Sequence, residues 1–144
     1  MNSQLRVALP VSAALIGIGF IALLLLMSSS EWGAPGTNAY LIYEARNRLI
    51  PVSLLFIGVG IVAGYLTLRN RLGRLGRLSF FLSVAGVASM LVGNVAEFWL
   101  FSGLPYGPMN ARAVSWSLFL LGGLLLLVGL TMFLIAAGRT TGRQ

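Results

Sequence analysis

Residues Leu49–Leu68 read LIPVSLLFIGVGIVAGYLTL, and no charged residue interrupts them. A membrane-spanning helix needs about 20 predominantly apolar residues, because each residue adds about 1.5 Å to a path across roughly 30 Å of hydrocarbon. Pro51 falls in the first turn of the expected helix, where the missing N–H of proline costs little. This stretch therefore predicts a transmembrane span.

Three further runs, residues 7–27, 79–101 and 113–137, have comparable length and character. Run 7–27 is longer than the apolar part of a secretory signal peptide, and no clear A-x-A cleavage site follows it, so we expect a retained span. Of the 144 residues, 58% are hydrophobic and 9% are charged, whereas about one quarter of a soluble domain is charged. The sequence predicts one all-α domain over residues 1–144, an integral membrane four-helix bundle.

The charged residues are distributed unequally between the two faces of the membrane. One face, which holds both termini and the connection between the second and third runs, carries seven arginines and no acid. These are Arg6, Arg69, Arg71, Arg74, Arg77, Arg139 and Arg143. On the opposite face three arginines balance three glutamates, so the net charge of +7 belongs to the first face. The balanced set is Arg46, Arg48, Arg112, Glu31, Glu44 and Glu97. Because basic connections stay on the cytoplasmic side, we expect both termini to be cytoplasmic in a bacterial inner membrane.

The basic connection contains RLGRLGRL (Arg71–Leu78), and its repeated glycines disfavour a firm helix. We therefore expect a short, tight turn there. Each arginine near an anionic membrane surface contributes about 1 kcal/mol of binding. The candidates for contact with anionic lipid headgroups, or with an acidic patch on a partner protein, are Arg69, Arg71, Arg74 and Arg77.

A further helical pattern follows the first run. Residues 39–51 read AYLIYEARNRLIP, and either Thr37 or Asn38 is suited to cap a helix there. Glu44 and Arg48 stand four residues apart and would support that helix slightly. We expect either a short helix along the outer surface or an outward extension of the second span.

Glu97 is the only carboxylate inside any of the four runs. It lies about 6 Å from the end of the third run, well short of the membrane midplane at about 15 Å. At that depth we expect its side chain to reach water or to pair with Arg112, Arg46 or Arg48. Asn94, one turn deeper, is expected to bond to a neighbouring helix. We interpret Glu97 as a structural clamp, with contact to a ligand or subunit and proton or cation handling as the alternatives.

Small and polar residues share one face of the third run, because residues three or four apart lie on the same side of a helix. The row at a spacing of four is Ala85, Ser89, Gly93 and Glu97. Small residues let membrane helices approach closely, and polar residues bond between them. We expect helix packing at Gly60, Gly64, Ala85 and Gly93. Polar contacts within the membrane are expected at Ser89, Asn94, Glu97 and Arg112.

Cysteine and histidine are absent, as are lysine and aspartate. The chain therefore lacks thiolate and imidazole ligands for a metal or haem and the usual catalytic bases. We expect no catalytic, metal-binding or cofactor-binding residues and no enzymatic activity. A bound lipid, quinone or carotenoid leaves no motif, so that kind of ligand stays open. The positive charge lies beneath a membrane face without a nucleic-acid-binding motif, so nucleic acid is not an expected partner.

These features favour a non-catalytic accessory or assembly subunit that packs against other subunits of a larger bacterial membrane complex. Its contacts would be small-residue helix faces and an aromatic outer rim. The rim residues are Trp32, Tyr40, Tyr43, Trp99, Tyr106 and Trp116. One alternative is a small oligomeric transporter or channel with a polar path along the third run. The other is a membrane protein that binds a lipid, a quinone or a pigment. The expected partners are membrane lipids and other membrane subunits or further copies of this chain.

Overall fold

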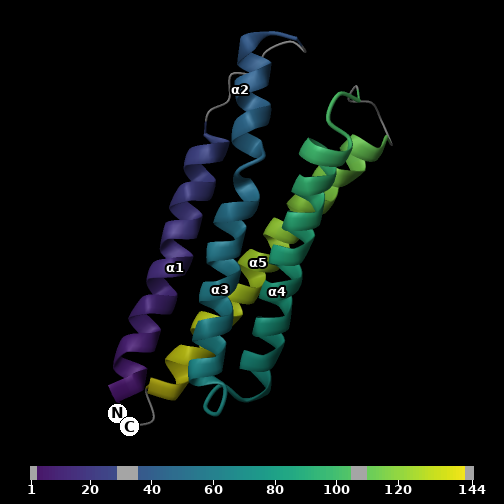
Figure 1. The fold of residues 1–144 in the computed structure, drawn as a ribbon. Helices are drawn as coiled ribbons and strands as arrows, with labels where there is room; N and C mark the ends of the chain where they lie inside the picture. The colour runs from purple at the N-terminus through teal and green to yellow at the C-terminus, as the bar shows by residue number, and fades with distance from the viewer. Residues whose placement is uncertain (1–2, 29–35, 105–109, 142–144) are drawn as a thin grey trace.

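The computed structural model describes residues 3–28, 36–104 and 110–141 (Figure 1). Its helices are α1 (Ser3–Met27), α2 (Asn38–Asn47), α3 (Ile50–Leu68), α4 (Gly73–Val95), the π-helical turn η1 (Ala96–Leu100) and α5 (Ala111–Thr141). Of the residues named in the sequence analysis, four lie outside the described residues, and the side chain of a fifth is not described. They are Glu31, Trp32, Tyr106 and Arg143, and Arg6 for its side chain.

Four helical segments are long and apolar enough to cross a membrane. They are Val7–Met27, Asn38–Leu68, Gly73–Leu100 and Ala111–Arg139. The prediction of an all-α fold with four candidate membrane spans is confirmed, and the chain is a multi-pass membrane protein.

Helix α2 extends the second span along the direction of α3 (Figure 1). Thr37 begins it, because the Thr37 side-chain oxygen accepts a hydrogen bond from the Tyr40 N–H at 3.3 Å. At the junction the Leu49 N–H donates to the Arg46 carbonyl and the Val52 N–H donates to the Leu49 carbonyl, each at 3.0 Å. These short turns carry the chain into α3, so the structure adopts the extension of the span rather than a separate surface helix.

Helix α4 begins earlier than the sequence predicts. The turn after α3 is confined to residues 69–72, and Gly73 starts α4 with a φ of +60°. The expectation of a turn throughout Arg71–Leu78 is therefore wrong. A glycine in a helix costs only about 1 kcal/mol. Packing outweighs that cost here, since Gly76 is buried directly beneath the buried Leu72 side chain.

The four spans form two antiparallel hairpins, α1 with α3 and α4 with α5, which meet where α3 packs on α4 (Figure 1). Between the hairpins lies an apolar core built around Leu54, Ile57, Met90, Phe119 and Leu126. We call the end at which α2 begins the network end. The opposite end is the arginine end, where α3 passes into α4, α1 begins and α5 ends (Figure 1).

Serine and glycine residues seven positions apart mark the contact face of each hairpin helix. The sets are Ser12 and Gly19 in α1, Ser53 and Gly60 in α3, Ser79, Gly86 and Gly93 in α4, and Ser115, Gly122 and Gly129 in α5. A Cβ added to Gly60 would lie 2.8 Å from the Ser12 carbonyl oxygen, and one added to Gly93 would lie 2.6 Å from the Ser115 carbonyl oxygen. The helix backbones touch at these points, so the contact requires glycine.

The four serines of this pattern are buried, and each hydroxyl donates a hydrogen bond within its own helix. Ser53 Oγ donates to the carbonyl three residues earlier and Ser115 Oγ to the carbonyl four residues earlier, each at 2.7 Å. Ser12 and Ser79 bond to the carbonyls three residues before them. Because the hydroxyls are satisfied locally, these serines contribute small size to the helix contact and not bonds across it.

The structure places the expected packing residues unequally. Gly60 and Gly93 lie in the backbone contacts, and a Cβ at Gly64 would lie 3.4 Å from Ser12 Oγ, an ordinary contact distance. Ala85 is exposed, so the expected row through Ala85 is not the buried one. Antiparallel close packing selects a spacing of seven, which keeps one seam facing the partner, and this seam passes through Gly86 instead.

Candidate functional site

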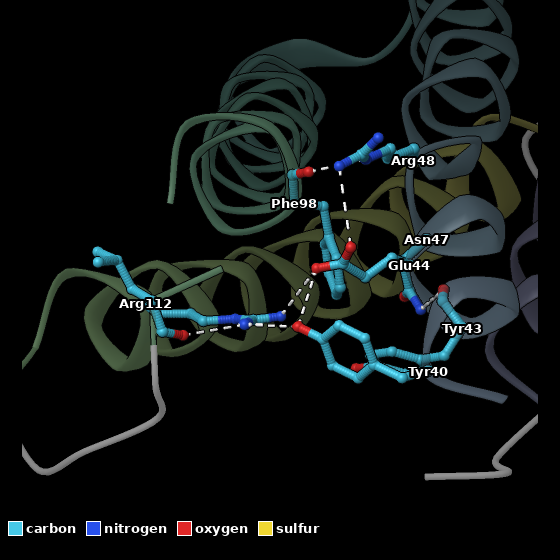
Figure 2. A network of polar contacts seen from close by, with 8 residues as sticks. Tyr40, Tyr43, Glu44, Asn47, Arg48, Phe98 and Arg112 are labelled. Carbon is cyan, nitrogen blue, oxygen red and sulfur yellow. Dashed lines mark hydrogen bonds and ion pairs between the residues drawn. The ribbon is translucent and has the colours of Figure 1, made fainter. Parts of the chain in front are cut away.

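A cluster of polar side chains joins α2, η1 and the start of α5 at the network end (Figure 2). Helix α2 places Tyr40, Glu44 and Arg48 four residues apart, so all three lie on one face. The Tyr40 hydroxyl donates to Glu44 Oε1 at 2.9 Å, and Arg48 Nη2 lies 3.9 Å from Glu44 Oε2. Glu44 is therefore held between a hydroxyl and a guanidinium of its own helix.

Arg112 enters this cluster from the first turn of α5 and is only 2% exposed. Its Nη1 donates to the Tyr40 hydroxyl at 2.9 Å and to the Leu104 carbonyl at 3.1 Å (Figure 2). Its Nη2 lies 3.7 Å from Glu44 Oε1. A cation at a helix N-terminus opposes the helix dipole, and burial removes its water, so Arg112 depends on these partners.

Glu97 lies in η1 and is only 1% exposed, so of the two expected environments, water or a neighbouring arginine, its burial favours the arginine. Tyr43 and Arg112 lie close enough to interact with it electrostatically. The structure thus brings Glu97 and Arg112 together, while Arg46 is exposed and Arg48 bonds elsewhere. Side chains at the end of α2 approach η1 and α4 here, since the Tyr43 ring lies edge-on to the ring of Phe98, the residue after Glu97, and Asn94 bonds to the Asn47 carbonyl.

The π-helical turn gives Arg48 a second partner. The Phe101 N–H donates to the Ala96 carbonyl, five residues back, at 2.9 Å. Arg48 Nε donates to the Phe98 carbonyl at 3.0 Å (Figure 2). The Arg48 guanidinium also lies 5.7 Å from the centre of the Trp99 ring. The bond from Arg48 to the Phe98 carbonyl connects α2 to the end of α4. π-Helical turns inside α-helices are frequent at functional sites.

Two buried asparagines complete the cluster. Asn94 Nδ2 donates to the Asn47 carbonyl at 3.1 Å, which is the helix-to-helix bond expected for Asn94. Asn47 Nδ2 donates to the Tyr43 carbonyl at 2.8 Å. Ser89, expected to belong to the same polar row, is half-buried and lies away from these groups. We call the set Tyr40, Tyr43, Glu44, Asn47, Arg48, Asn94, Glu97 and Arg112 the polar network.

Sequence reasoning missed Tyr40, Tyr43 and Asn47 as network members. The two tyrosines were assigned to an aromatic rim, yet Tyr40 bonds to Glu44 and the Tyr43 ring lies edge-on to the Phe98 ring at 5.7 Å. The available signal is the spacing of four between Tyr40 and Glu44, on the same helix face. Trp99 stays 58% exposed, as expected for a rim residue.

The network contains two glutamates and two arginines, so its charges balance within the site. Among the described residues, the buried polar side chains outside the network are serines: Ser12, Ser53, Ser79, Ser83 and Ser115. No group of three acidic, cysteine or histidine side chains within the described part is placed to hold a metal ion. The arrangement is suited to fastening helices together, because each buried charge lies beside an opposite one.

The described residues form two notable apolar hollows outside the polar network. A cavity of about 530 Å³ lies between α1, α3 and α5, and Ser83 of α4 also lines it; we call it the three-helix cavity. A groove of about 440 Å³ follows the face of α3, and we call it the α3 groove. Its lining residues are Leu54, Leu55, Gly58, Val59, Val62, Ala63, Leu66 and Val87.

The arginines expected to contact lipid or a partner all lie at the arginine end and are exposed. They are Arg69, Arg71, Arg74 and Arg77, of which the last two belong to α4.

No known protein family, curated protein or solved structure matches this chain.

Proposed function

We propose that this chain is a non-catalytic accessory subunit of a larger bacterial membrane complex, and that it holds another membrane protein against the α3 groove. The observation that carries the proposal is the open groove itself, about 440 Å³ in volume. Leu55, Val59 and Leu66 line it and are each more than half exposed. A second transmembrane helix is an occupant of matching shape and chemistry.

The floor of the α3 groove supports close approach of such a helix. Gly58 and Ala63 place small side chains among the longer ones, and membrane helices approach each other over small residues. A Cβ added to Gly58 would meet Val87 Cγ1 at 3.5 Å, an ordinary contact distance, so this glycine is not required by packing within the chain. Its small size is therefore available to a partner.

The polar network supports a structural role for the charged groups. Glu44 and Arg112 approach to 3.7 Å, and Arg48 bonds to the Phe98 carbonyl. Charges arranged in this way hold α2, η1 and α5 together. The exposed apolar faces are then the parts of the described chain that can recognise a membrane partner.

Site-specific photo-crosslinking tests the proposal. A photoreactive residue at Val59 is expected to crosslink to one discrete membrane protein other than this chain, while one at Leu127, an exposed position on α5, is expected not to. Gly58→Leu fills the groove and should abolish that crosslink. The matched control is Gly123→Leu, since a Cβ at Gly123 meets nothing within 4 Å. Equal crosslinking from Val59 and Leu127, or crosslinking to this chain alone, would contradict the proposal.

We further propose that the arginine end faces the bacterial cytoplasm and that both termini lie there. The exposed arginines at this end support that orientation, because basic connections stay on the cytoplasmic side. The chain has no native cysteine, so single cysteines report the topology cleanly. A membrane-impermeant thiol reagent should label Leu104→Cys in intact cells and Arg74→Cys only after lysis. The reverse pattern would overturn the orientation.

The transporter alternative makes a different prediction for Glu97. If Glu97 handles protons or cations, Glu97→Gln abolishes flux in proteoliposomes without lowering stability. In the accessory-subunit proposal, Glu97→Gln lowers thermal stability because it removes one charge from the balanced network, and proteoliposomes of the native chain show no flux above protein-free vesicles. Flux that is lost in the variant would favour the transporter.

A further inference from the structure

The three-helix cavity lies where the two hairpins fail to close on each other. α1 packs closely on α3 and α5 packs closely on α4, whereas α1 and α5 do not form a close pair among the described helices. The walls include Ile16 of α1, Ile61 of α3 and Leu130 of α5. The cavity volume of about 530 Å³ is within the range of ligand sites.

The cavity opens sideways to the surrounding membrane. Leu134 of α5 lines it and is 71% exposed, and Ala13 of α1 lines it and is also exposed. Gly17 lines the same wall, and a Cβ added there would meet nothing within 4 Å. Because glycine has no side chain, Gly17 leaves room for an apolar chain to enter between α1 and α5.

Unneutralised positive charge stands at the arginine end of this cavity. Leu68 and Ala137 form its last lining residues on α3 and α5. Arg69 follows Leu68 directly and Arg139 lies two residues beyond Ala137, and both arginines are exposed. Neither forms an ion pair within the described residues, since the glutamates described belong to the polar network at the other end.

We propose that the three-helix cavity is a binding site for an anionic phospholipid, with one acyl chain in the cavity and the phosphate beside Arg69 and Arg139. Apart from Ser12 and Ser83 the walls are apolar or glycine and match the acyl chain, and the two cations at the mouth match the headgroup in charge and in depth. This inference stands apart from the proposed accessory role, because it uses neither the α3 groove nor a protein partner.

Native mass spectrometry of the full chain in mild detergent tests the proposal with two lipids of identical acyl chains, phosphatidylglycerol and phosphatidylcholine. One phosphatidylglycerol should bind saturably and about 30-fold more tightly than phosphatidylcholine, given the usual contribution of two arginines. Arg69→Gln with Arg139→Gln should remove that preference. The matched control is Arg74→Gln with Arg77→Gln, which removes the same charge from the same end on α4 and should retain it.

Two cavity variants test the acyl-chain position. Gly17→Leu fills the cavity and should weaken phosphatidylglycerol binding at least tenfold, while Gly123→Leu should leave it unchanged. Ala13→Leu fills the cavity from a neighbouring position and gives a second reading if Gly17→Leu lowers the thermal stability. Equal binding of the two lipids, equal losses in both arginine pairs, or undiminished binding in both cavity variants would overturn the proposal. Displacement of phosphatidylglycerol by an equimolar neutral quinone would overturn it as well.

Discussion

In the α4·α5 hairpin, a Cβ at Gly86, Gly93, Gly122 or Gly129 would strike the backbone of the facing helix. In the described part of the α1·α3 hairpin, two glycines have this property, Gly19 and Gly60. Both hairpins use the same spacing of seven between small residues. The longer pattern in α4 and α5 continues the backbone contact over more turns than the shorter pattern in α1 and α3, so we call α4·α5 the closed hairpin and α1·α3 the open hairpin. The three-helix cavity lies beside the α1·α3 pair, where α5 does not close on α1.

The polar network connects these unequal hairpins at one end. It joins α2, which continues α3, to η1 and α5, which belong to the other hairpin. A membrane protein gains little from burying apolar surface against apolar surface, because lipid chains are equally apolar. Close backbone packing and polar bonds must therefore supply the specificity of the helix contacts. This chain uses backbone packing within each hairpin and polar bonds between the two hairpins.

The largest expected effect is loss of the connection between the hairpins. Arg112→Gln removes the buried cation that lies near the buried Glu97 and 3.7 Å from Glu44, and it should lower the free energy of unfolding by about 3–5 kcal/mol. Arg46→Gln, at an exposed position of α2, is the matched control and should change it by less than about 0.5 kcal/mol. Unfolding in sodium dodecyl sulfate, followed by circular dichroism, measures both. Equal effects of the two variants would show that the network does not connect the hairpins.

The next largest effect lies within the closed hairpin. Gly86→Ala places a Cβ 2.5 Å from the Leu126 nitrogen and 2.7 Å from the Gly122 carbonyl oxygen, so the two backbones must separate. Contacts on either side of Gly86 resist that separation, and we expect a loss of about 3 kcal/mol in the same unfolding assay. A loss below that of Gly60→Ala would reverse the comparison.

A smaller effect is expected in the open hairpin. Gly60→Ala meets Ile16 Cγ1 at 2.7 Å and the Ser12 carbonyl oxygen at 2.8 Å. Among the spanning helices that the structure describes, α1 packs closely on α3 alone, so it can shift away without breaking a second contact. The expected loss is about 1–2 kcal/mol. Overpacking usually costs up to about 3 kcal/mol. A loss of about 3 kcal/mol or more would therefore mean that further contacts hold α1 in place.

The smallest effect is expected at glycines that face open space in each hairpin. A Cβ at Gly17 or at Gly123 meets nothing within 4 Å. Alanine at either position should raise stability by about 0.5–1 kcal/mol, because alanine loses less backbone entropy in a helix. Thermal denaturation of the two single variants checks this, and a loss at either position would indicate a close neighbour there.

The sequence predicts the spans better than their contacts. Uninterrupted apolar runs such as Leu49–Leu68 locate the four helices, since length and hydropathy alone satisfy the membrane. The start of α4 at Gly73 was not predicted, because the low helix propensity of glycine favours a turn, whereas packing stabilises a helix there. Ala85 is expected at a helix contact because it stands at a spacing of four from Ser89 and Gly93, whereas the backbone contacts of α4 lie at Gly86 and Gly93, seven residues apart.

The polar network was predictable only in part. The charge balance on one face named Glu97 and Arg112 as candidate partners, and the structure brings them together. The full burial of Glu97 could not be read from its depth in the third run, because its surroundings include groups from distant segments, Tyr43 of α2 and Arg112 of α5. Whether a connecting helix lies flat or continues a span depends on contacts with distant segments, which the local sequence of α2 does not contain.

The most direct test of the connection between the hairpins is a double-mutant cycle between Glu44→Gln and Arg112→Gln. These side chains come from different hairpins and approach to 3.7 Å. The free energies of unfolding of the two single variants and the double variant give the coupling energy. We expect a coupling of about 1–3 kcal/mol, with the double variant less destabilised than the sum of the singles. Additivity within about 0.5 kcal/mol would contradict the claim that the polar network holds the two hairpins together.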